Sequence, residues 1–125
     1  MNVDDSFRDF VLDQLRARPG FSEGRAGGVD ALECRPMFGG YGLYQGKTFF
    51  GILFRGRVYF KTDAESRAVY RDAGMKPFRP RAAQTLTSYY EVPVDILEDA
   101  DQLVAWARRA VQCRTPVAER GARHR

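Results

Sequence analysis

Apolar and polar residues alternate most clearly between Arg35 and Lys61, in a run of three short segments with β-strand character. The segments, which are rich in aromatic and aliphatic residues, are Tyr41–Tyr44, Lys47–Phe54 and Arg57–Lys61. Gln45-Gly46 and Arg55-Gly56 separate them and fit tight two-residue hairpin turns. Connections this short permit only antiparallel pairing, so the pattern predicts an antiparallel meander on which the rest of the chain packs.

Two further strands are predicted on either side of the meander. In residues 31–37, Leu32 and Cys34 share one face, and Pro36 requires an edge position or a bulge. Thr85–Val92 also alternates. Its predicted faces are Leu86, Ser88, Tyr90 and Val92 on one side, and Thr87, Tyr89 and Glu91 on the other.

An amphipathic helix is predicted at the N-terminus. Ser6 and Asp9 have capping-box spacing, and Pro19-Gly20 ends the pattern before a glycine-rich connection over residues 21–30. The apolar stripe of this helix consists of Phe7, Phe10, Val11 and Leu15.

A second capping box, from Thr62 to Glu65, predicts a middle helix that runs to about Ala73, with Gly74 just past its end. The residues expected to face inward are small: Ala64, Ala68, Val69 and Ala73. The following segment, residues 76–81, reads as a basic loop that two prolines hold extended.

A last helix is predicted from the cap Asp99, with Gln102 at the reciprocal position. Its apolar stripe contains Leu103, Trp106, Ala107 and Ala110, and Trp106 is expected to be a large buried anchor. Because the strands are clustered rather than interleaved with helices, we predict an α+β fold. An antiparallel meander sheet would pack with an N-terminal, a middle and a C-terminal helix.

Length and charge fit one domain with a basic tail. The chain has 125 residues, 44% hydrophobic, and no apolar run approaches the ~20 residues of a membrane span. Residues 112–125 carry four arginines against one glutamate, a net +3 of the +4 of the whole chain. We expect a domain over residues 1–111 and a frayed tail over 112–125. Two lone cysteines, Cys34 and Cys113, are expected to be reduced thiols, as in a cytoplasmic protein.

Candidate catalytic groups are sparse. The sole histidine, His124, lies next to the C-terminal residue, which argues against a histidine triad or a multi-histidine metal site. The glycines of residues 39–42 lead into a strand with no following Lys-Ser/Thr, so a tight turn or bulge fits better than a phosphate loop. Acidic pairs fit helix starts. We therefore expect that the protein is not an enzyme and that it binds neither a cofactor nor a metal ion.

Binding is better supported. A partner-binding set on the sheet comprises Arg35, Arg57, Tyr59, Lys61 and Tyr89. A nucleic-acid-binding set in the basic loop comprises Lys76, Phe78, Arg79 and Arg81. Aromatic residues mixed with cations suit protein interfaces, nucleic-acid surfaces and ordinary solvated sheet faces alike, and the three alternatives stand side by side here.

One run of residues resembles the hallmark of the TfoX/Sxy N-terminal domain. It consists of Met37, Phe38, Gly39, Gly40, Tyr41 and Gly42, followed by Leu43-Tyr44. The similarity continues through Arg57–Asp63, Ser66-Arg67, Gly74–Phe78, Ser88–Pro93 and Trp106–Ala110. It spans roughly residues 6–111.

The resemblance implies a curved antiparallel sheet flanked by helices in a cytoplasmic bacterial protein. It also implies a role in regulating competence, in which longer family members work with a cyclic-AMP receptor protein and carry a helical C-terminal domain. The expectation here is a stand-alone N-terminal domain without catalytic residues.

The leading hypothesis is therefore a non-enzymatic protein-interaction module in transcriptional regulation. Alternatives are direct nucleic-acid binding through the basic loop and tail, and a small-ligand-binding domain or enzyme. A homodimer is a further alternative for the partner.

Overall fold

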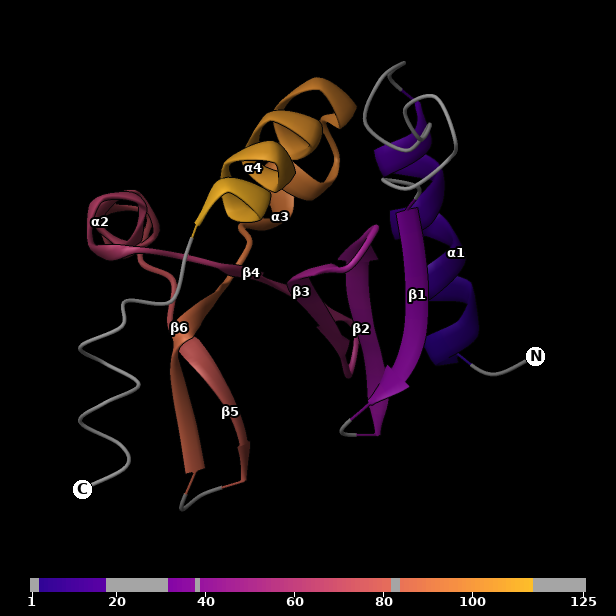
Figure 1. The fold of residues 1–125 in the computed structure, drawn as a ribbon, viewed down its shortest axis with the longest axis horizontal. Coiled ribbons are helices and arrows are strands. Elements are labelled where there is room, and N and C mark those ends of the chain that lie inside the picture. Colours follow the sequence, from indigo (N-terminus) through magenta and orange to yellow (C-terminus); the bar gives the residue numbers. More distant parts are fainter. Residues whose placement is uncertain (1–2, 18–31, 38, 82–83, 114–125) are drawn as a thin grey trace.

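The computed structural model describes residues 3–17, 32–37, 39–81 and 84–113, which form one antiparallel sheet and four helices (Figure 1). The helices are α1 (Val3–Arg16), α2 (Ala64–Asp72), α3 (Val94–Leu97) and α4 (Ala100–Gln112). The strands are β1 (Leu32–Met37), β2 (Gly40–Gln45), β3 (Thr48–Phe54), β4 (Arg57–Lys61), β5 (Pro77–Arg81) and β6 (Gln84–Glu91). The predicted α+β class is confirmed. The predicted glycine-rich connection and most of the basic tail lie outside the described residues.

The sheet has the strand order β1-β2-β3-β4-β6-β5, and every neighbouring pair is antiparallel. Strands β2 to β4 form the predicted meander, and β1, the predicted first strand, pairs with β2. Pro36 lies in β1, an edge strand, as predicted from the missing backbone donor of proline. The other edge strand, β5, is the segment predicted to be a basic loop. Its two prolines, Pro77 and Pro80, fit an edge for the same reason.

The hairpin turns account for several glycines. The β2–β3 turn is centred on Gly46 and Lys47, one residue later than predicted, with Gly46 at φ 61°. In the predicted β3–β4 turn, Arg55 has φ 51° and Gly56 has φ 77°. Positive φ at both central residues is the mark of a type I′ turn, whose twist suits a β-hairpin.

A β-bulge decides which face two neighbouring phenylalanines occupy. The β2–β3 register shifts between Leu43 and Tyr44, which pair with Gly51 and Phe49, so that Phe50 is the extra residue. Phe50 therefore packs in the helix-side core, while Phe49 joins a cluster on the opposite face.

α1 confirms only part of its prediction. The helix begins before Ser6, so the capping box predicted there is wrong. Val11 and Leu15 are fully buried as predicted, but Phe10 is 41% exposed and Leu12 takes an inward position instead.

α2 is capped one residue later than predicted and turns a different face inward. Asp63 is the N-cap: its carboxylate accepts a hydrogen bond from the Ser66 amide at 2.8 Å, and Ser66 Oγ accepts one from the Asp63 amide at 3.0 Å. Ser66 and Tyr70 are the buried residues. The four residues predicted to face inward, Ala64, Ala68, Val69 and Ala73, are all exposed. Gly74, at φ 80°, ends the helix as predicted.

α4 follows its prediction closely. Asp99 accepts a hydrogen bond from the Gln102 amide at 3.2 Å, and Leu103, Ala107 and Ala110 are buried. Trp106 is the exception. It is only half-buried, at the margin of the core rather than inside it.

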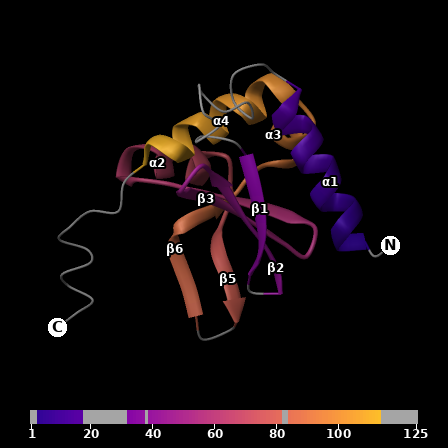
Figure 2. The ribbon, with the colours of Figure 1, turned by 45° about the vertical axis from the view of Figure 1, so that its right-hand side comes forward.

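The helix-side face of the sheet carries the main core (Figure 2). Leu43, Phe50, Val58 and Phe60 are fully buried there against residues of α1, α3 and α4. Leu32 and Cys34 share this face as predicted, Leu32 in the core and Cys34 packed against it.

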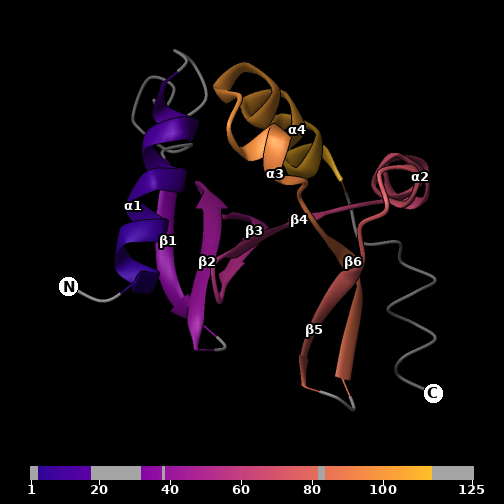
Figure 3. The same ribbon diagram turned by 180° about the vertical axis from the view of Figure 1, so that it is seen from behind.

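The sheet bends away from the helices, and its other face is concave (Figures 1 and 3). Phe78 of β5 reaches Phe54 of β3, with ring centroids 5.3 Å apart, although β4 and β6 lie between these strands in the sheet. Phe78 and Ile52 are fully buried, and every member of this second cluster comes from a strand. Leu86 belongs to it, so its predicted place beside Tyr90 is wrong. The register shifts between β5 and β6 mark this irregularity.

Candidate functional site

A row of three aromatic side chains lies on the concave face. In this aromatic row, the Tyr44 and Phe49 ring centroids are 5.1 Å apart, and those of Phe49 and Tyr89 are 5.4 Å apart. All three side chains are half-buried. The Arg35 guanidinium lies 4.6 Å from the centroid of Tyr44, and Lys61 pairs with Tyr89 across β4 and β6. The row therefore has Arg35 at its Tyr44 end, and Lys61 lies beside Tyr89 on β4, the strand between β3 and β6.

The structure brings three of the five predicted partner-binding residues to this row: Arg35, Lys61 and Tyr89. Tyr44 and Phe49 were missed. Tyr44 alternates correctly with Leu43, but the bulge that turns Phe49 toward it has no signal in the sequence. Burial raises the pKa of the Tyr89 hydroxyl, so it stays neutral near pH 7.

The other two predicted partner-binding residues lie elsewhere on the concave face. Tyr59 is only 9% exposed beneath Phe78, with the ring centroids 4.7 Å apart, so its predicted exposure is wrong. Arg57 is exposed and donates to both carboxylate oxygens of Glu91, at 3.0 and 3.1 Å. An exposed ion pair of this kind contributes little to stability.

The predicted nucleic-acid set is split by the fold. Phe78 is fully buried, so it cannot stack on a base as the loop prediction requires. Lys76, Arg79 and Arg81 are exposed along the edge strand or just before it, and Arg79 Nε donates to Thr85 Oγ1 at 3.1 Å. The three cations are exposed, but the aromatic that was expected between them is buried.

The glycine-rich signature has a structural role in this fold. Gly39 has φ +82°, which favours glycine, and a Cβ on Gly40 would collide with the main-chain carbonyl of Leu53. A Cβ on Gly42 would lie 3.0–3.3 Å from the side chains of Met37, Phe49 and Tyr44. The prediction of a tight turn with close backbone approach is confirmed at these glycines. Phe38 lies outside the described residues.

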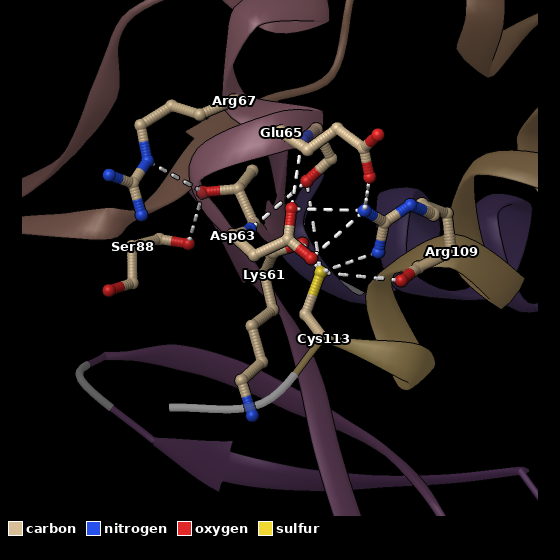
Figure 4. Close-up of polar contacts among 9 residues, drawn as sticks. Lys61, Asp63, Glu65, Arg67, Ser88, Arg109 and Cys113 are labelled. Carbon is tan, nitrogen blue, oxygen red and sulfur yellow. Dashed lines mark hydrogen bonds and ion pairs between the residues drawn. The ribbon is translucent and has the colours of Figure 1, made fainter. Parts of the chain in front are cut away.

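A polar cluster joins the N-terminus of α2 to the end of α4 (Figure 4). Arg109 Nη2 lies 2.9 Å from Asp63 Oδ2 and 3.1 Å from Glu65 Oε1. The Cys113 thiol is buried nearby, 3.7 Å from Ser66 Oγ. The backbone hydrogen bond from Ser66, aided by Arg109, lowers the pKa of Asp63 to about 2. Asp63 is thus ionised near neutral pH, and its ion pair with Arg109 links α2 to α4.

Beside this cluster, an open groove of about 470 Å³ separates α2 from α4. Val69 and Tyr70 line it from α2, and Ala105 and Trp106 line it from α4. The rings of Tyr70 and Trp106 meet edge to face at 4.8 Å. We name this feature the α2–α4 groove. Sequence reasoning missed it because Val69 was assigned to the core.

Neither thiol has the surroundings of a nucleophile. Burial raises the pKa of both Cys34 and Cys113, which disfavours the thiolate. Within residues 3–17, 32–37, 39–81 and 84–113, no three His, Cys, Asp or Glu side chains gather closely enough to hold a metal ion. No helix in the described part of the chain is long and apolar enough to cross a membrane.

The fold and the concave face define a small α+β domain whose bent antiparallel sheet carries helices on one side only in the part that the structure describes. The model of the TfoX N-terminal domain family matches residues 26–114, more than half of the chain, and the chain belongs to this family. The match begins after α1 and includes the glycine signature and the aromatic row. No curated protein matches the chain.

Proposed function

We propose that the protein is a non-enzymatic interaction module of transcriptional regulation, of the kind that controls competence for DNA uptake. The observation that carries this proposal is the aromatic row, with Arg35 over Tyr44 at one end and Lys61 beside Tyr89. Tyr, Phe and Arg are enriched in the cores of protein interfaces, where rigid rings contribute contact area at low entropic cost. Membership of the TfoX N-terminal domain family supports the regulatory role.

The partner that fits this row is a protein segment with apolar side chains and carboxylates. The rings of Tyr44, Phe49 and Tyr89 would contact its apolar side chains. Arg35 and Lys61 would attract its carboxylates and set its register along the row. Burial raises the pKa of both thiols, which disfavours their use as nucleophiles and supports a binding role over thiol catalysis.

The test reverses the charge of the two cations beside the aromatic row and measures partner binding. Tagged wild-type protein and the double variant Arg35→Glu, Lys61→Glu are expressed in the source organism at equal levels, and co-purified proteins are quantified by mass spectrometry. We expect the wild type to retrieve a transcription regulator that the double variant retrieves at least tenfold less. Transcripts of DNA-uptake genes should fall in parallel.

The matched control is Arg79→Glu with Arg81→Glu, which reverses two exposed cations on β5 and leaves the row intact. This control should retrieve the regulator at the wild-type level. Equal recovery by the row variant and the wild type, with equal transcript levels, would refute the proposal.

Nucleic-acid binding through β5 is the second candidate, and it is favoured by the exposure of Lys76, Arg79 and Arg81 on one edge of the sheet. Each phosphate neutralised adds about −0.9 to the slope of log affinity against log salt for duplex DNA. The β5 control variant therefore doubles as its test. A gel shift that the wild type gives at low salt and the β5 variant loses would support this candidate, and no shift by the wild type would exclude it.

A further inference from the structure

Large apolar side chains are exposed in the α2–α4 groove. Val69 is 53% exposed on α2, and Trp106 is half-buried on the facing side of α4. A tryptophan at the margin of a groove, with Tyr70 packed against its ring, is typical of an interface anchor. The groove lies on the helix side of the sheet and is separate from the aromatic row.

Two exposed acidic residues of α2 lie along the groove: Glu65 lines it, and Asp72 lies just beyond the lining residues. Arg109 already contacts two carboxylates, those of Asp63 and Glu65, and the Glu65 side chain is 91% exposed. Asp72 lies two helical turns after Glu65, on the same side of α2 as Val69, and is exposed. One guanidinium therefore faces two carboxylates at one end of the groove, and the Asp72 carboxylate lies toward the other end.

We propose that the α2–α4 groove is a second docking site, which binds a short protein segment carrying one large apolar side chain flanked by Lys or Arg. The apolar side chain would lie between Val69 and Trp106. The flanking cations would pair with Glu65 at one end and Asp72 at the other. A volume of about 470 Å³ accommodates a few side chains of such a segment, not a folded domain. This binding mode is the one in which a helix or extended peptide lies in a groove between helices.

Binding in the groove can be followed by tryptophan fluorescence, because Trp106 lines the groove and is the single tryptophan of the chain. The probe is a phage-displayed library of 12-residue peptides without tryptophan, selected on the full-length protein. We expect enrichment of sequences with Leu, Ile or Phe between basic residues. The synthetic peptides should shift the Trp106 emission to shorter wavelength as they exclude water from the ring.

Variants locate the binding. Val69→Lys should weaken the selected peptides at least tenfold, because it places a cation on the apolar wall that repels the flanking Lys or Arg, at a position exposed enough to tolerate it. The matched control is Val94→Lys on α3, since Val94 is 62% exposed and does not line the groove. Glu65→Gln with Asp72→Asn should weaken the peptides three- to tenfold and reduce the salt dependence of their binding. Thermal melts of each variant check folding.

Three results would overturn the proposal. The first is that no selected peptide distinguishes Val69→Lys from Val94→Lys. The second is a gain of tenfold or more in peptide affinity when residues 114–125 are removed, with displacement of the peptides by the free 114–125 segment. That result would make the chain's own C-terminal segment the occupant. The third is a concentration-dependent dimer that Val69→Lys abolishes, which would make a second copy the occupant. Each result leaves the tests of the aromatic row unaffected.

Discussion

Both faces of the sheet carry aromatic and aliphatic side chains, but the two faces differ in what covers these side chains and in how deeply they are buried. On the helix side, Phe50, Phe60 and Val58 are fully buried under α1, α3 and α4. On the concave side, strand residues alone pack together, and the burial declines from Phe78 and Ile52 to the half-buried aromatic row. On the helix side, the helices cover the sheet and bury its side chains completely. On the concave side, the bent sheet buries only the side chains that lie inside the bend. The part of the concave face beyond that curve keeps aromatic rings accessible.

The largest expected difference between the faces is in stability. Phe60→Ala should lower the free energy of unfolding by about 3–5 kcal/mol, because it leaves a cavity in a fully packed site. Phe49→Ala should cost about 1–2 kcal/mol, because its ring is half-exposed already. Urea unfolding of both variants measures this contrast. Equal losses would mean that the concave face is as much a core as the helix side.

The glycine signature gives a sharper contrast within one turn. Gly40→Ala should cost about 1–3 kcal/mol, since its Cβ collides with the Leu53 carbonyl and forces β2 away from β3. Gly39→Asn should cost less, up to about 1 kcal/mol, because nothing lies within 4 Å of a Cβ there and asparagine adopts positive φ with less strain than other non-glycine residues. Thermal melts of the two variants measure the difference in stability. A neutral Gly40→Ala would contradict the close approach.

The link between α2 and α4 should depend on pH in a defined window. Asp63→Ala should cost about 1 kcal/mol at pH 7 through loss of the cap. The folded pKa of Asp63, about 2, lies below its ordinary value of 3.8, so its stabilisation is complete above pH 4 and is lost as pH falls through 2. The difference between wild type and variant should shrink across that window in urea unfolding. The exposed Glu98→Ala serves as control, and a constant difference down to pH 2 would contradict this account.

The smallest effect on stability should come from the row's own cations. Arg35→Glu with Lys61→Glu should change the unfolding free energy by less than about 1 kcal/mol, since neither side chain is fully buried and Arg35 makes an exposed pair with Glu33 and an exposed cation–π contact with Tyr44. Circular dichroism melts provide the check. A large destabilisation would make these residues structural, and loss of partner binding in the variant would then be uninformative.

Sequence reasoning predicted the strands better than the helix orientations, and α2 shows why. Ala64, Ala68 and Ala73 form an apolar stripe in the sequence, but an alanine side chain buries little area and does not decide which face turns inward. Tyr70 decides it instead, through contacts with Trp106 and Tyr90 that come from distant parts of the chain. The capping box was misplaced by one residue because Thr62 and Asp63 both suit an N-cap.

The candidate site was predictable only where strict alternation holds. Arg35, Lys61 and Tyr89 were assigned to one surface correctly, because β1, β4 and this part of β6 keep a regular two-residue period. Phe49 and Phe78 were not, since a bulge and a strong bend place them, and both depend on pairing between strands. Phe78 in particular reads as an exposed aromatic in a basic loop until β5 is folded over β3 and β4.

Site-specific photo-crosslinking tests the central claim, that the aromatic row is the docking surface, most directly. A photoreactive phenylalanine analogue replaces Tyr44 in the row, or Phe10, which is 41% exposed on α1, as control. Both proteins are irradiated in cells of the source organism, and the products are identified by mass spectrometry. The account predicts a crosslink to a transcription regulator from position 44 that is absent from position 10. The same products from both positions, or none from position 44 under conditions where the regulator co-purifies, would contradict it.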